Sequence, residues 1–400
     1  MLSGKRILLG VSGGIAAYKA VEVLRKLTEL GAEVRVVMTR NAARFVAPLT
    51  FSALSGTPVL TDEFAEAAWG PLGHIAVTDG LDLALVAPAT ANIIGKVAAG
   101  IADDALSTAL VAAECPVIIA PAMNDRMYRN TIVQKNISSL KAAGVRFVEP
   151  GSGPLACGTA GTGRLASPES IVQAVAGALS PKDLAGISVL VTAGPTREPI
   201  DAARFISNPS TGKMGYALAA EARNRGAEVI LISGPTHLAV PQGVDRRSVT
   251  TAAEMNHEVH KHAARCQVVI MAAAVSDFRP KGPSERKLKK EDAGLTVELE
   301  RTEDILQGLG TAKEGRILVG FAAETDDLVR NAGEKLKKKN LDMIVANKIG
   351  QAGAGFGSET NAAVLMDNRG KVSELPLMLK AELAVHIIDA IVELKKNQGL

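Results

Sequence analysis

The same order of elements begins twice along this chain. An apolar run at Arg6–Val11 is followed by the break Ser12-Gly13-Gly14 and then by a stretch with helical periodicity. A second apolar run, Ser188–Thr192, passes through Gly194-Pro195 before another helical stretch begins. Two such starts, about one domain length apart, predict two α/β domains with parallel sheets that bind ligands at the carboxyl ends of their strands.

The spacing of apolar residues places the first helix. Apolar residues recur at i, i+3, i+4 and i+7 from Ala20 to Leu27, which predicts a helix over Ile15–Leu30. Gly31 supplies the left-handed position that ends this helix, and the next strand follows at residues 32–38. The second half repeats the pattern, with a predicted helix at Lys213–Arg225 and a strand at residues 226–232.

Length and composition agree with two domains. The 400 residues exceed the roughly 250 to 300 at which a single core stops growing, and 47% of them are hydrophobic. We place the boundary near Ser180–Gly186, which gives domains at residues 1–183 and 184–400. The aromatic share of 3% and the net charge of +3 disfavour a nucleic-acid-binding surface, so we expect no nucleic-acid partner.

The cysteines and apolar segments indicate the compartment. Cys115, Cys157 and Cys266 are odd in number and widely spaced, which favours a reducing compartment over a disulfide framework. Charged residues interrupt the apolar region at Leu81–Ala122, so no uncharged span reaches the roughly 18 residues that a membrane helix needs. We therefore expect a cytoplasmic protein with no membrane partner.

The loop Gly10–Ile15 joins the first predicted strand to a helix amino terminus, where free backbone N–H groups favour a phosphate. Its glycines do not follow the GxGxxG dinucleotide pattern, so NAD binding is weakly supported. A mononucleotide such as FMN suits an open sheet equally well. Taken alone, the loop fits a tight turn as well as a ligand site.

Two later strands end in the same way. The apolar runs within residues 83–92 and 117–124 each close on an Ala-Pro pair, and an amide follows, Asn92 in the first and Asn124 in the second. Proline stops the strand ladder and leaves the polar group at the carboxyl end, where ligands bind. We expect the two ends to line one pocket.

Two further residues carry reactive side chains. His74 lies in Gly73-His74-Ile75, and a lone histidine is more often structural than catalytic. Cys157 lies in the glycine-rich segment Gly151–Gly163, which is longer than a connection requires and therefore predicts a lid. For Cys115 and Cys266, a buried inert thiol is the expected role.

Together these residues resemble a known family. The motifs Ser12–Lys19, Gly73-His74-Ile75, Pro121–Asn124 and Ala156-Cys157-Gly158 resemble the flavin-dependent cysteine decarboxylases. The second half, with its motif at residues 207–215, resembles the phosphopantothenate-cysteine ligases. The fused order is similar to the bifunctional proteins of bacterial coenzyme A biosynthesis, and this resemblance covers nearly the whole chain.

For the first half, the resemblance implies a flavodoxin-like fold, FMN as cofactor, and decarboxylation of 4'-phosphopantothenoylcysteine to 4'-phosphopantetheine. Direct loss of CO2 would leave an unstabilised carbanion, whereas prior oxidation of the thiol to a thioaldehyde provides an electron sink. By resemblance, His74 is the base in thiol oxidation, Asn124 binds the substrate carboxylate or amide, and Cys157 donates the final proton. The resemblance places FMN against Ser12, Gly13, Gly14, Thr39, Thr90 and Asn92.

Strand exits in the second half carry candidate ligands. Residues 204–215 lead into the helix predicted at Lys213–Arg225. Their glycine spacing is not that of a Walker A loop. Like a Walker A loop, however, they form a segment rich in glycine and hydroxyl groups before a helix amino terminus. The apolar strand Val268–Asp277 ends in small residues that let a nucleotide approach, and Asp277 suits a ribose, a metal or a helix cap. The segment Ser284–Lys290 is basic, as an anionic reaction requires.

For this half, the resemblance implies that the carboxylate of 4'-phosphopantothenate attacks the α-phosphate of CTP, and that the amine of L-cysteine then displaces CMP. By resemblance, Lys287 serves the second step or the phosphates, and Asn208 stabilises the acyl-cytidylate, with Arg204 nearby. Mg2+ is the expected counter-ion, with Asp277 as its candidate ligand. The implied CTP site comprises Met271, Ala272, Ala273, Asp277, Glu303, Asp304, Ile305, Leu306, Phe321, Lys335 and Lys339.

The resemblance has few departures, and two alternatives stay open. Around Arg301–Asp304 the usual Asn-Pro-Asp-Ile run is altered, which affects the cytidine contacts rather than the activity. The missing GxGxxG pattern disfavours an NAD(P)-dependent reductase. Retention of His74, Asn124 and Cys157 together disfavours a regulatory flavoprotein subunit. The resemblance also implies a homo-oligomer, a dodecamer of decarboxylase trimers with ligase halves paired outside it.

Overall fold

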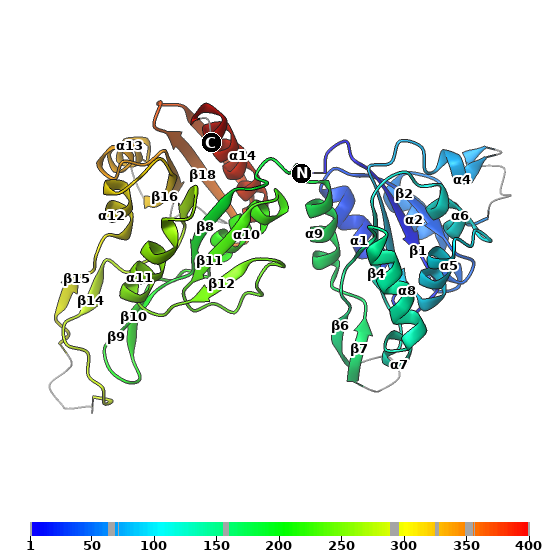
Figure 1. Ribbon diagram of the computed structural model, residues 1–400, viewed down its shortest axis with the longest axis horizontal. Helices are drawn as coiled ribbons and strands as arrows, with labels where there is room; N and C mark the ends of the chain where they lie inside the picture. Colours follow the sequence, from blue (N-terminus) through cyan, green and yellow to red (C-terminus); the bar gives the residue numbers. More distant parts are fainter. Residues whose placement is uncertain are drawn as a thin grey trace. The chain divides into compact units, whose positions relative to one another are not determined.

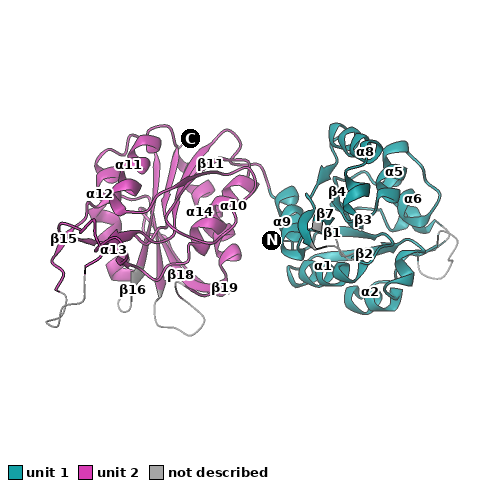
Figure 2. Ribbon diagram, turned by 90° about the horizontal axis from the view of Figure 1, so that it is seen from below, with its two compact units in different colours: residues 1–180 teal, residues 181–400 magenta. Residues whose placement is uncertain are grey.

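The computed structural model describes residues 2–62, 69–70, 72–154, 160–288, 296–324, 328–348, 355 and 357–398. The chain divides into two compact units, Met1–Ser180 and Pro181–Leu400, which Figure 2 colours separately. Each unit contains a largely parallel sheet with helices on both faces (Figure 1), which confirms the predicted α/β class.

The first unit contains a five-stranded sheet in the order β2-β1-β3-β4-β5, and every pair is parallel. The strands are β1 (Arg6–Val11), β2 (Glu33–Met38), β3 (Leu83–Ala89), β4 (Val117–Pro121) and β5 (Arg146–Phe147). This is the flavodoxin-like order, which confirms the predicted fold of this unit. The strand order reverses between β1 and β3, and sheets of this kind bind ligands beyond the carboxyl ends at such a reversal.

Helices cover both faces of this sheet. They are α1 (Ala17–Glu29), η1 (Ala42–Arg44), α2 (Pro48–Ser55), α4 (Gly73–Ala76), α5 (Ala91–Ala99), α6 (Ala105–Ala112), α7 (Asp125–Tyr128), α8 (Thr131–Ala142) and α9 (Pro168–Leu179). Because alternate strand residues point to opposite sides, Leu9 of β1 packs with α1, α2 and α9, whereas Leu8 packs with α5, α6 and α8. The predicted apolar face of α1 is buried, and Gly31 follows that helix with a φ of 85°.

The second unit contains an eight-stranded sheet in the order β12-β11-β8-β13-β16-β17-β18-β19. The strands are β8 (Ser188–Ala193), β11 (Glu228–Ser233), β12 (Asp245–Ser248), β13 (Val268–Met271), β16 (Ile317–Glu324), β17 (Met343–Lys348), β18 (Thr360–Asp367) and β19 (Val372–Leu379). The six strands from β12 to β17 are parallel, as predicted, and they follow the Rossmann order 3-2-1-4-5-6, while β18 and β19 are antiparallel additions. The reversal lies between β8 and β13.

The helices of the second unit divide between the two faces of its sheet, as Figure 2 shows. The helices α10 (Lys213–Asn224) and α14 (Lys380–Gln398) pack with Val189 and Val191 of β8. The helices α11 (Ala252–Ala263), α12 (Ile305–Thr311) and α13 (Leu328–Lys338) pack with Leu190 on the other face. Two hairpins, β9 (Arg197–Pro199) with β10 (Phe205–Ser207) and β14 (Phe278–Pro280) with β15 (Leu299–Arg301), contact each other through β9 and β14.

The glycine-rich segment of the first unit is more regular than its composition indicates. It contains two antiparallel strands, β6 (Gly151–Pro154) and β7 (Ala160–Arg164), where we expected only a loop. Gly163 has a φ of 142°, which glycine adopts readily, so a high glycine content is compatible with this hairpin. The residues between the strands, Cys157 among them, lie outside the described part of the chain, and the lid stays a prediction.

None of the helices in the described ranges is long and apolar enough to cross a membrane.

Candidate active sites

At the reversal of the first sheet, Ser12 joins the ends of two strands. Its buried hydroxyl donates a hydrogen bond to the Pro88 carbonyl at 2.8 Å. The backbone N–H of Thr90 donates to the same hydroxyl oxygen at 3.0 Å. The loop after β1 and the start of α5 are therefore held against each other at the carboxyl edge of the sheet.

The glycines beside Ser12 allow the surrounding loops to approach closely. A Cβ on Gly13 would lie 2.3 Å from the Cβ of Asn41, so a larger residue does not fit there without movement. A Cβ on Gly14 would lie 3.6 Å from the methyl group of Thr90. Thr39 donates its backbone N–H to the Val11 carbonyl at 3.1 Å, which places it at the end of β1. The structure thus brings together Ser12, Gly13, Gly14, Thr39 and Thr90.

The amino terminus of α5 also has the features of a phosphate-binding site. Thr90 precedes this nine-residue helix, but its side chain accepts no capping hydrogen bond from the first turn. Asn92 lies in that turn and is exposed. First-turn N–H groups and the helix dipole favour an anion. These loops therefore fit the phosphate of a mononucleotide such as FMN.

Asn124 follows β4 and begins the short helix α7. Its side-chain oxygen accepts the N–H of Arg126 at 2.9 Å. The hairpin strand β7 is tied to this segment, because Met123 donates its N–H to the Gly163 carbonyl at 2.9 Å. A carboxylate oxygen of Asp125 also accepts the N–H of Thr162 at 3.1 Å. The β7 strand of the β6–β7 hairpin is therefore anchored beside Asn124.

His74 lies toward the opposite edge of the first sheet from Asn124. A Cβ on its neighbour Gly73 would lie 3.3 Å from the side chain of Leu60, which pairs with Val37 on the outer side of β2. Four strand spacings of about 4.8 Å separate this outer position from β4, so His74 lies on the order of 19 Å from the Asn124 end. Figure 1 shows α4 and α7 at different ends of the unit. The two residues therefore lie toward opposite edges of the sheet within one chain.

The second unit has a cavity at the reversal between β8 and β13. Its volume is about 340 Å3, and its lining comes from the loops after both strands, from α10 and from α13. Many of the residues predicted for the nucleotide site line it, namely Asn208, Ala272, Ala273, Asp277, Leu306, Phe321, Lys335 and Lys339. Both faces of the sheet contribute lysines, which gives the cavity a positive lining suited to phosphates.

Asn208 fixes the loop that follows β13. Its side-chain N–H2 donates to the carbonyls of Ala274 and Val275 at 3.2 and 3.3 Å. The nearby helix α10 packs closely on β8, because a Cβ on Gly215 would lie 2.5 Å from the Cβ of Ala193. The amide and the helix amino terminus therefore border the same cavity from fixed positions.

Three residues predicted to contact the nucleotide, Met271, Asp304 and Ile305, do not line this cavity. The side chains of Met271 and Ile305 are buried in the core beneath the cavity, so they support its wall and do not line it. Asp304 begins α12, where its carboxylate accepts the N–H of Gln307 and pairs with the Lys339 ammonium at 2.8 Å. Asp304 thus orients a cavity lysine, and this pairing lowers the pKa of its carboxyl group against the opposing effect of burial.

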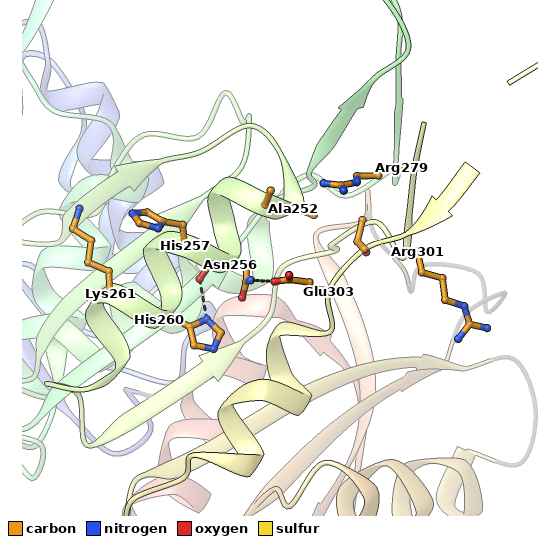
Figure 3. Close-up of a pocket in the computed structure, with 10 residues that line it drawn as sticks. Ala252, Asn256, His257, His260, Lys261, Arg279, Arg301 and Glu303 are labelled. Atoms are coloured by element: carbon orange, nitrogen blue, oxygen red, sulfur yellow. Dashed lines mark hydrogen bonds between the residues drawn. The ribbon is translucent and has the colours of Figure 1, made fainter. Parts of the chain in front are cut away.

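Glu303 points into a second cavity, of about 540 Å3, between α11 and the β14–β15 hairpin. Figure 3 shows its carboxylate directed at Asn256, whose side-chain N–H2 donates to it. His260 lies below this pair, and Arg301 points away from it (Figure 3). Glu303 therefore does not line the cavity with Asn208. The altered run at Arg301–Asp304 gave the signal for this difference.

Asp277, the predicted metal ligand, is exposed and lines the 340 Å3 cavity. The described residues contain no group of three or more His, Cys, Asp or Glu side chains that is arranged to hold a metal. Mg2+ commonly binds through one or two carboxylates together with substrate phosphates and water. One carboxylate beside a phosphate-binding cavity fits that mode.

Arg204 and the basic segment meet at the buried Asp201. The Arg204 guanidinium pairs with the Asp201 carboxylate at 2.6 Å and donates to the Leu288 carbonyl at 2.8 Å. Hydrogen bonds from the backbone N–H groups of Ala203, Leu288 and Arg204, together with the guanidinium, lower the pKa of Asp201 to about 2. Lys287 is exposed and directly precedes this anchor. Neither Arg204 nor Lys287 lines the 340 Å3 cavity of the same chain.

Replacing Asp201 with Asn is expected to lower the unfolding temperature of the second unit by several degrees at neutral pH. A carboxyl whose folded pKa is about 2 stabilises the fold above its unfolded pKa, near 4, and this contribution disappears as the pH falls toward 2. The difference between wild type and variant should therefore shrink below about pH 4. Thermal unfolding between pH 7 and pH 3 measures this difference in unfolding temperature. The control variant is Asp245→Asn, because Asp245 is exposed and pairs with Arg247 at the surface. Equal losses in both variants would contradict this role.

Comparison with known proteins decides the family. Residues 1–180 match the family described as Flavoprotein, and residues 184–394 match the DNA/pantothenate metabolism flavoprotein C-terminal domain. The Coenzyme A biosynthesis bifunctional protein CoaBC of Bacillus subtilis (strain 168) is 50% identical over 403 residues, which cover 100% of this chain and 99% of that protein. The chain belongs to the CoaBC family. The CoaBC protein of Escherichia coli (strain K12) is 44% identical over 399 residues, with 98% and 97% covered.

Solved structures similar to this chain include a crystal structure of the C-terminal domain of a CoaBC protein. It is 43% identical, covers 54% of this chain and 99% of its own length, and has a TM-score of 0.48. A structure of a PPC decarboxylase mutant complexed with pantothenoylaminoethenethiol is 33% identical, covers 43% and 96%, and has a TM-score of 0.40.

Several residues that line the cavity of this CoaBC chain were not predicted from the sequence. They are contributed by the start of α10 and by the last third of the chain. Glycine and lysine spacing at residues 212–215 was a signal for the first group, whereas nothing local marks the second. The unpredicted lining includes Ser210, Gly212, Lys213, Met214, Gly215, Asn347, Asn361 and Lys380.

Proposed function

We propose that this chain catalyses two successive steps of coenzyme A biosynthesis. Residues 184–400 ligate 4'-phosphopantothenate with L-cysteine at the expense of CTP, and residues 1–183 decarboxylate the product to 4'-phosphopantetheine with FMN. The observation that carries the proposal is the 340 Å3 cavity at the Rossmann reversal, where Asn208 and Asp277 lie with lysines from both faces of the sheet. Its position and charge suit a nucleotide triphosphate and a second phosphorylated substrate.

In the ligase reaction, a carboxylate oxygen of 4'-phosphopantothenate attacks the α-phosphorus of CTP, and the bond to pyrophosphate breaks. The amine of cysteine then attacks the acyl carbon, loses a proton and displaces CMP. The amide of Asn208, held by two carbonyls, borders the reacting acyl phosphate, while Lys335 and Lys339 bind the nucleotide. Asp277 would hold Mg2+, which would offset the negative charge of the triphosphate. Arg204 and Lys287 do not line this cavity in the same chain, so the positive charge that the resemblance assigns to them at the acyl-cytidylate would come from a paired ligase half.

In the decarboxylase reaction, the residues of this chain position the substrate and move its protons. His74 takes the thiol proton, Asn124 binds the carboxylate that leaves as CO2, and Cys157 protonates the final enethiolate carbon. FMN, when bound, accepts the two electrons of thiol oxidation and returns them in the last reduction. Its phosphate would lie against Ser12–Gly14 and the start of α5, with Thr39, Thr90 and Asn92 around it.

We further propose that the decarboxylase site forms between copies of the chain in a homo-oligomer, which the resemblance gives as a dodecamer. The separation of His74 from Asn124 within one chain supports this, because a substrate of this size needs both. Among the residues that the structure describes, the buried Nδ1 atom of His74 has no hydrogen-bond partner. The composition and the reducing cysteine pattern support a cytoplasmic enzyme without nucleic-acid or membrane partners.

Mixing two inactive variants tests the shared site. His74→Asn and Asn124→Ser are each expected to lose decarboxylation, and serine at 124 retains the ability to cap α7. When the two are co-expressed in equal amounts, about a quarter of the sites receive both intact residues, so about a quarter of the wild-type rate should return. If His74 and Asn124 act within one chain, no activity returns.

The overall function is tested with the purified wild-type chain, 4'-phosphopantothenate, L-cysteine, Mg2+ and either CTP or ATP. Mass analysis should show the condensed acid with CTP and then its loss of CO2. Condensation without decarboxylation would support the ligase assignment and contradict the assignment of the flavin-dependent decarboxylase site. The absence of condensation with either nucleotide would contradict the ligase assignment.

A further inference from the structure

Two threonine hydroxyls hold the backbone of the loop that follows β13. The N–H of Ser276 donates to the Thr196 hydroxyl oxygen at 3.0 Å, and the Thr302 hydroxyl donates to the Ser276 carbonyl at 2.6 Å. Thr196 and Ser276 are buried. The hydroxyl of Ser276 itself has no hydrogen-bond partner in the part of the chain that the structure describes. Side chains from two other segments therefore fix both backbone groups of Ser276.

The register of the β14–β15 hairpin brings Thr302 to this loop. Phe278 of β14 pairs with Arg301 of β15, so Asp277 and Thr302 are the adjoining residues on the two sides of the hairpin. The N–H of Thr302 donates to the Asp277 carbonyl at 3.0 Å. Thr302 thus holds two successive carbonyls, that of Asp277 through its backbone and that of Ser276 through its hydroxyl. Only the second contact depends on the type of residue at position 302.

The side chain of Asp277, in contrast, is exposed and lines the 340 Å3 cavity. Within the described ranges, its carboxylate takes part in no hydrogen bond or ion pair. The backbone of Asp277 is therefore fixed, while its carboxylate is left to an external partner. Mg2+ requires nearly octahedral geometry with oxygen ligands at about 2.0 to 2.1 Å, so it binds best to a carboxylate whose position is already set.

We propose that Thr302 is a positioning residue of the ligase, whose hydroxyl fixes the Ser276–Asp277 backbone so that the Asp277 carboxylate meets the metal ion on the triphosphate. The inference rests on the proposed ligase function. Thr302 lines the separate 540 Å3 cavity and does not line the 340 Å3 cavity, so it acts through Asp277 and not by contact with the substrate. The alternative is a hydroxyl that only stabilises the hairpin.

CTP binding to the full-length chain, measured by calorimetry with Mg2+ and again without any divalent ion, distinguishes these roles. Thr302→Val has nearly the same shape and removes the donor, whereas Thr302→Ser keeps it. With Mg2+, the valine variant should bind CTP about fivefold to tenfold more weakly than wild type, as loss of one hydrogen bond predicts. Without the metal, its affinity should change by less than about twofold, and the serine variant should match wild type in both conditions.

A double-mutant cycle tests whether Thr302 acts through Asp277. Asp277→Asn should itself weaken binding of CTP in the presence of Mg2+, because the amide is a poorer ligand than the carboxylate. In this background, Thr302→Val should weaken binding further by less than about twofold. Thr311→Val is the matched control, because the Thr311 hydroxyl also donates to a backbone carbonyl, that of Gln307 at 3.0 Å, in an exposed turn of α12. This control should bind CTP as wild type does.

Three results would show a structural role and overturn the proposal: equal weakening with and without Mg2+, no recovery by serine at 302, or a full further loss in the Asp277→Asn background. Unchanged binding by Thr302→Val would overturn it as well. If the wild-type chain binds CTP but gains nothing from Mg2+, the proposal fails and the nucleotide site stands. A wild-type chain that does not bind CTP in either condition would contradict the proposed function itself.

Discussion

Replacing Cys157 with Ser should stop the reaction sequence before 4'-phosphopantetheine, whose rate of formation should fall by about a thousandfold or more, because Cys157 acts after CO2 has left. The proposed proton donor at the final step is a thiol, and a hydroxyl is a far weaker acid near neutral pH. Serine has nearly the same size, so the hairpin that carries position 157 should keep its anchor beside Asn124. Mass analysis of a timed reaction measures 4'-phosphopantothenoylcysteine and 4'-phosphopantetheine.

The ligase rate of the Cys157 variant serves as its control, because the two activities belong to separate units. Cys266→Ser provides a second control, since that thiol is buried in the other unit and burial raises its pKa. The proposed role of Cys157 would be contradicted if the Cys157 variant formed 4'-phosphopantetheine at the wild-type rate. A parallel loss of condensation would instead indicate a general folding defect.

Replacing Asn208 with Asp should reduce ligation by about 100-fold to 1,000-fold while leaving decarboxylation of supplied 4'-phosphopantothenoylcysteine unchanged. The amide donates to the carbonyls of Ala274 and Val275, and a carboxylate has no N–H to donate. The new charge would also repel the anionic acyl-cytidylate. The measurement is the rate of CMP formation, followed with and without the substrates in excess.

The unfolding temperature of the Asn208 variant decides how a loss of ligation is interpreted. If the second unit unfolds near the wild-type temperature while CMP formation is lost, the amide acts on the reaction. Ligation at the wild-type rate would remove Asn208 from the proposed mechanism. If substrate excess restores the full rate, Asn208 contributes to binding and not to the reacting state.

The fold followed from local signals because parallel strands buried on both faces have continuous apolar runs. Both strand–loop–helix starts, the flavodoxin-like order and the Rossmann order agree with those runs. The hairpin β6–β7 was missed because its strands are short and rich in glycine, a residue that disfavours strands when judged by propensity alone.

The candidate sites were predictable where ligands follow a strand directly. Ser12 and Thr90 directly follow β1 and β3, and Asn208 and Asp277 lie in the connections that leave β8 and β13, where the loops of a parallel sheet converge. Asn361 of β18 and Lys380 of α14 were missed because they lie more than 80 residues beyond β13 along the chain, although they line the same cavity. The separation of His74 from Asn124 was also hidden, because it depends on which strands form the edges of the sheet, and the strand order is not a local signal.

Each hydrophobic core described above draws its side chains from one unit alone. The two clusters of the first unit contain buried residues from Leu2 to Val175, and those of the second run from Leu184 to Leu394. A destabilising substitution in one unit therefore leaves the core packing of the other unit intact, and we expect the two units to unfold in separate thermal transitions. Natural selection can therefore adjust the heat tolerance of each activity separately, although one gene encodes both.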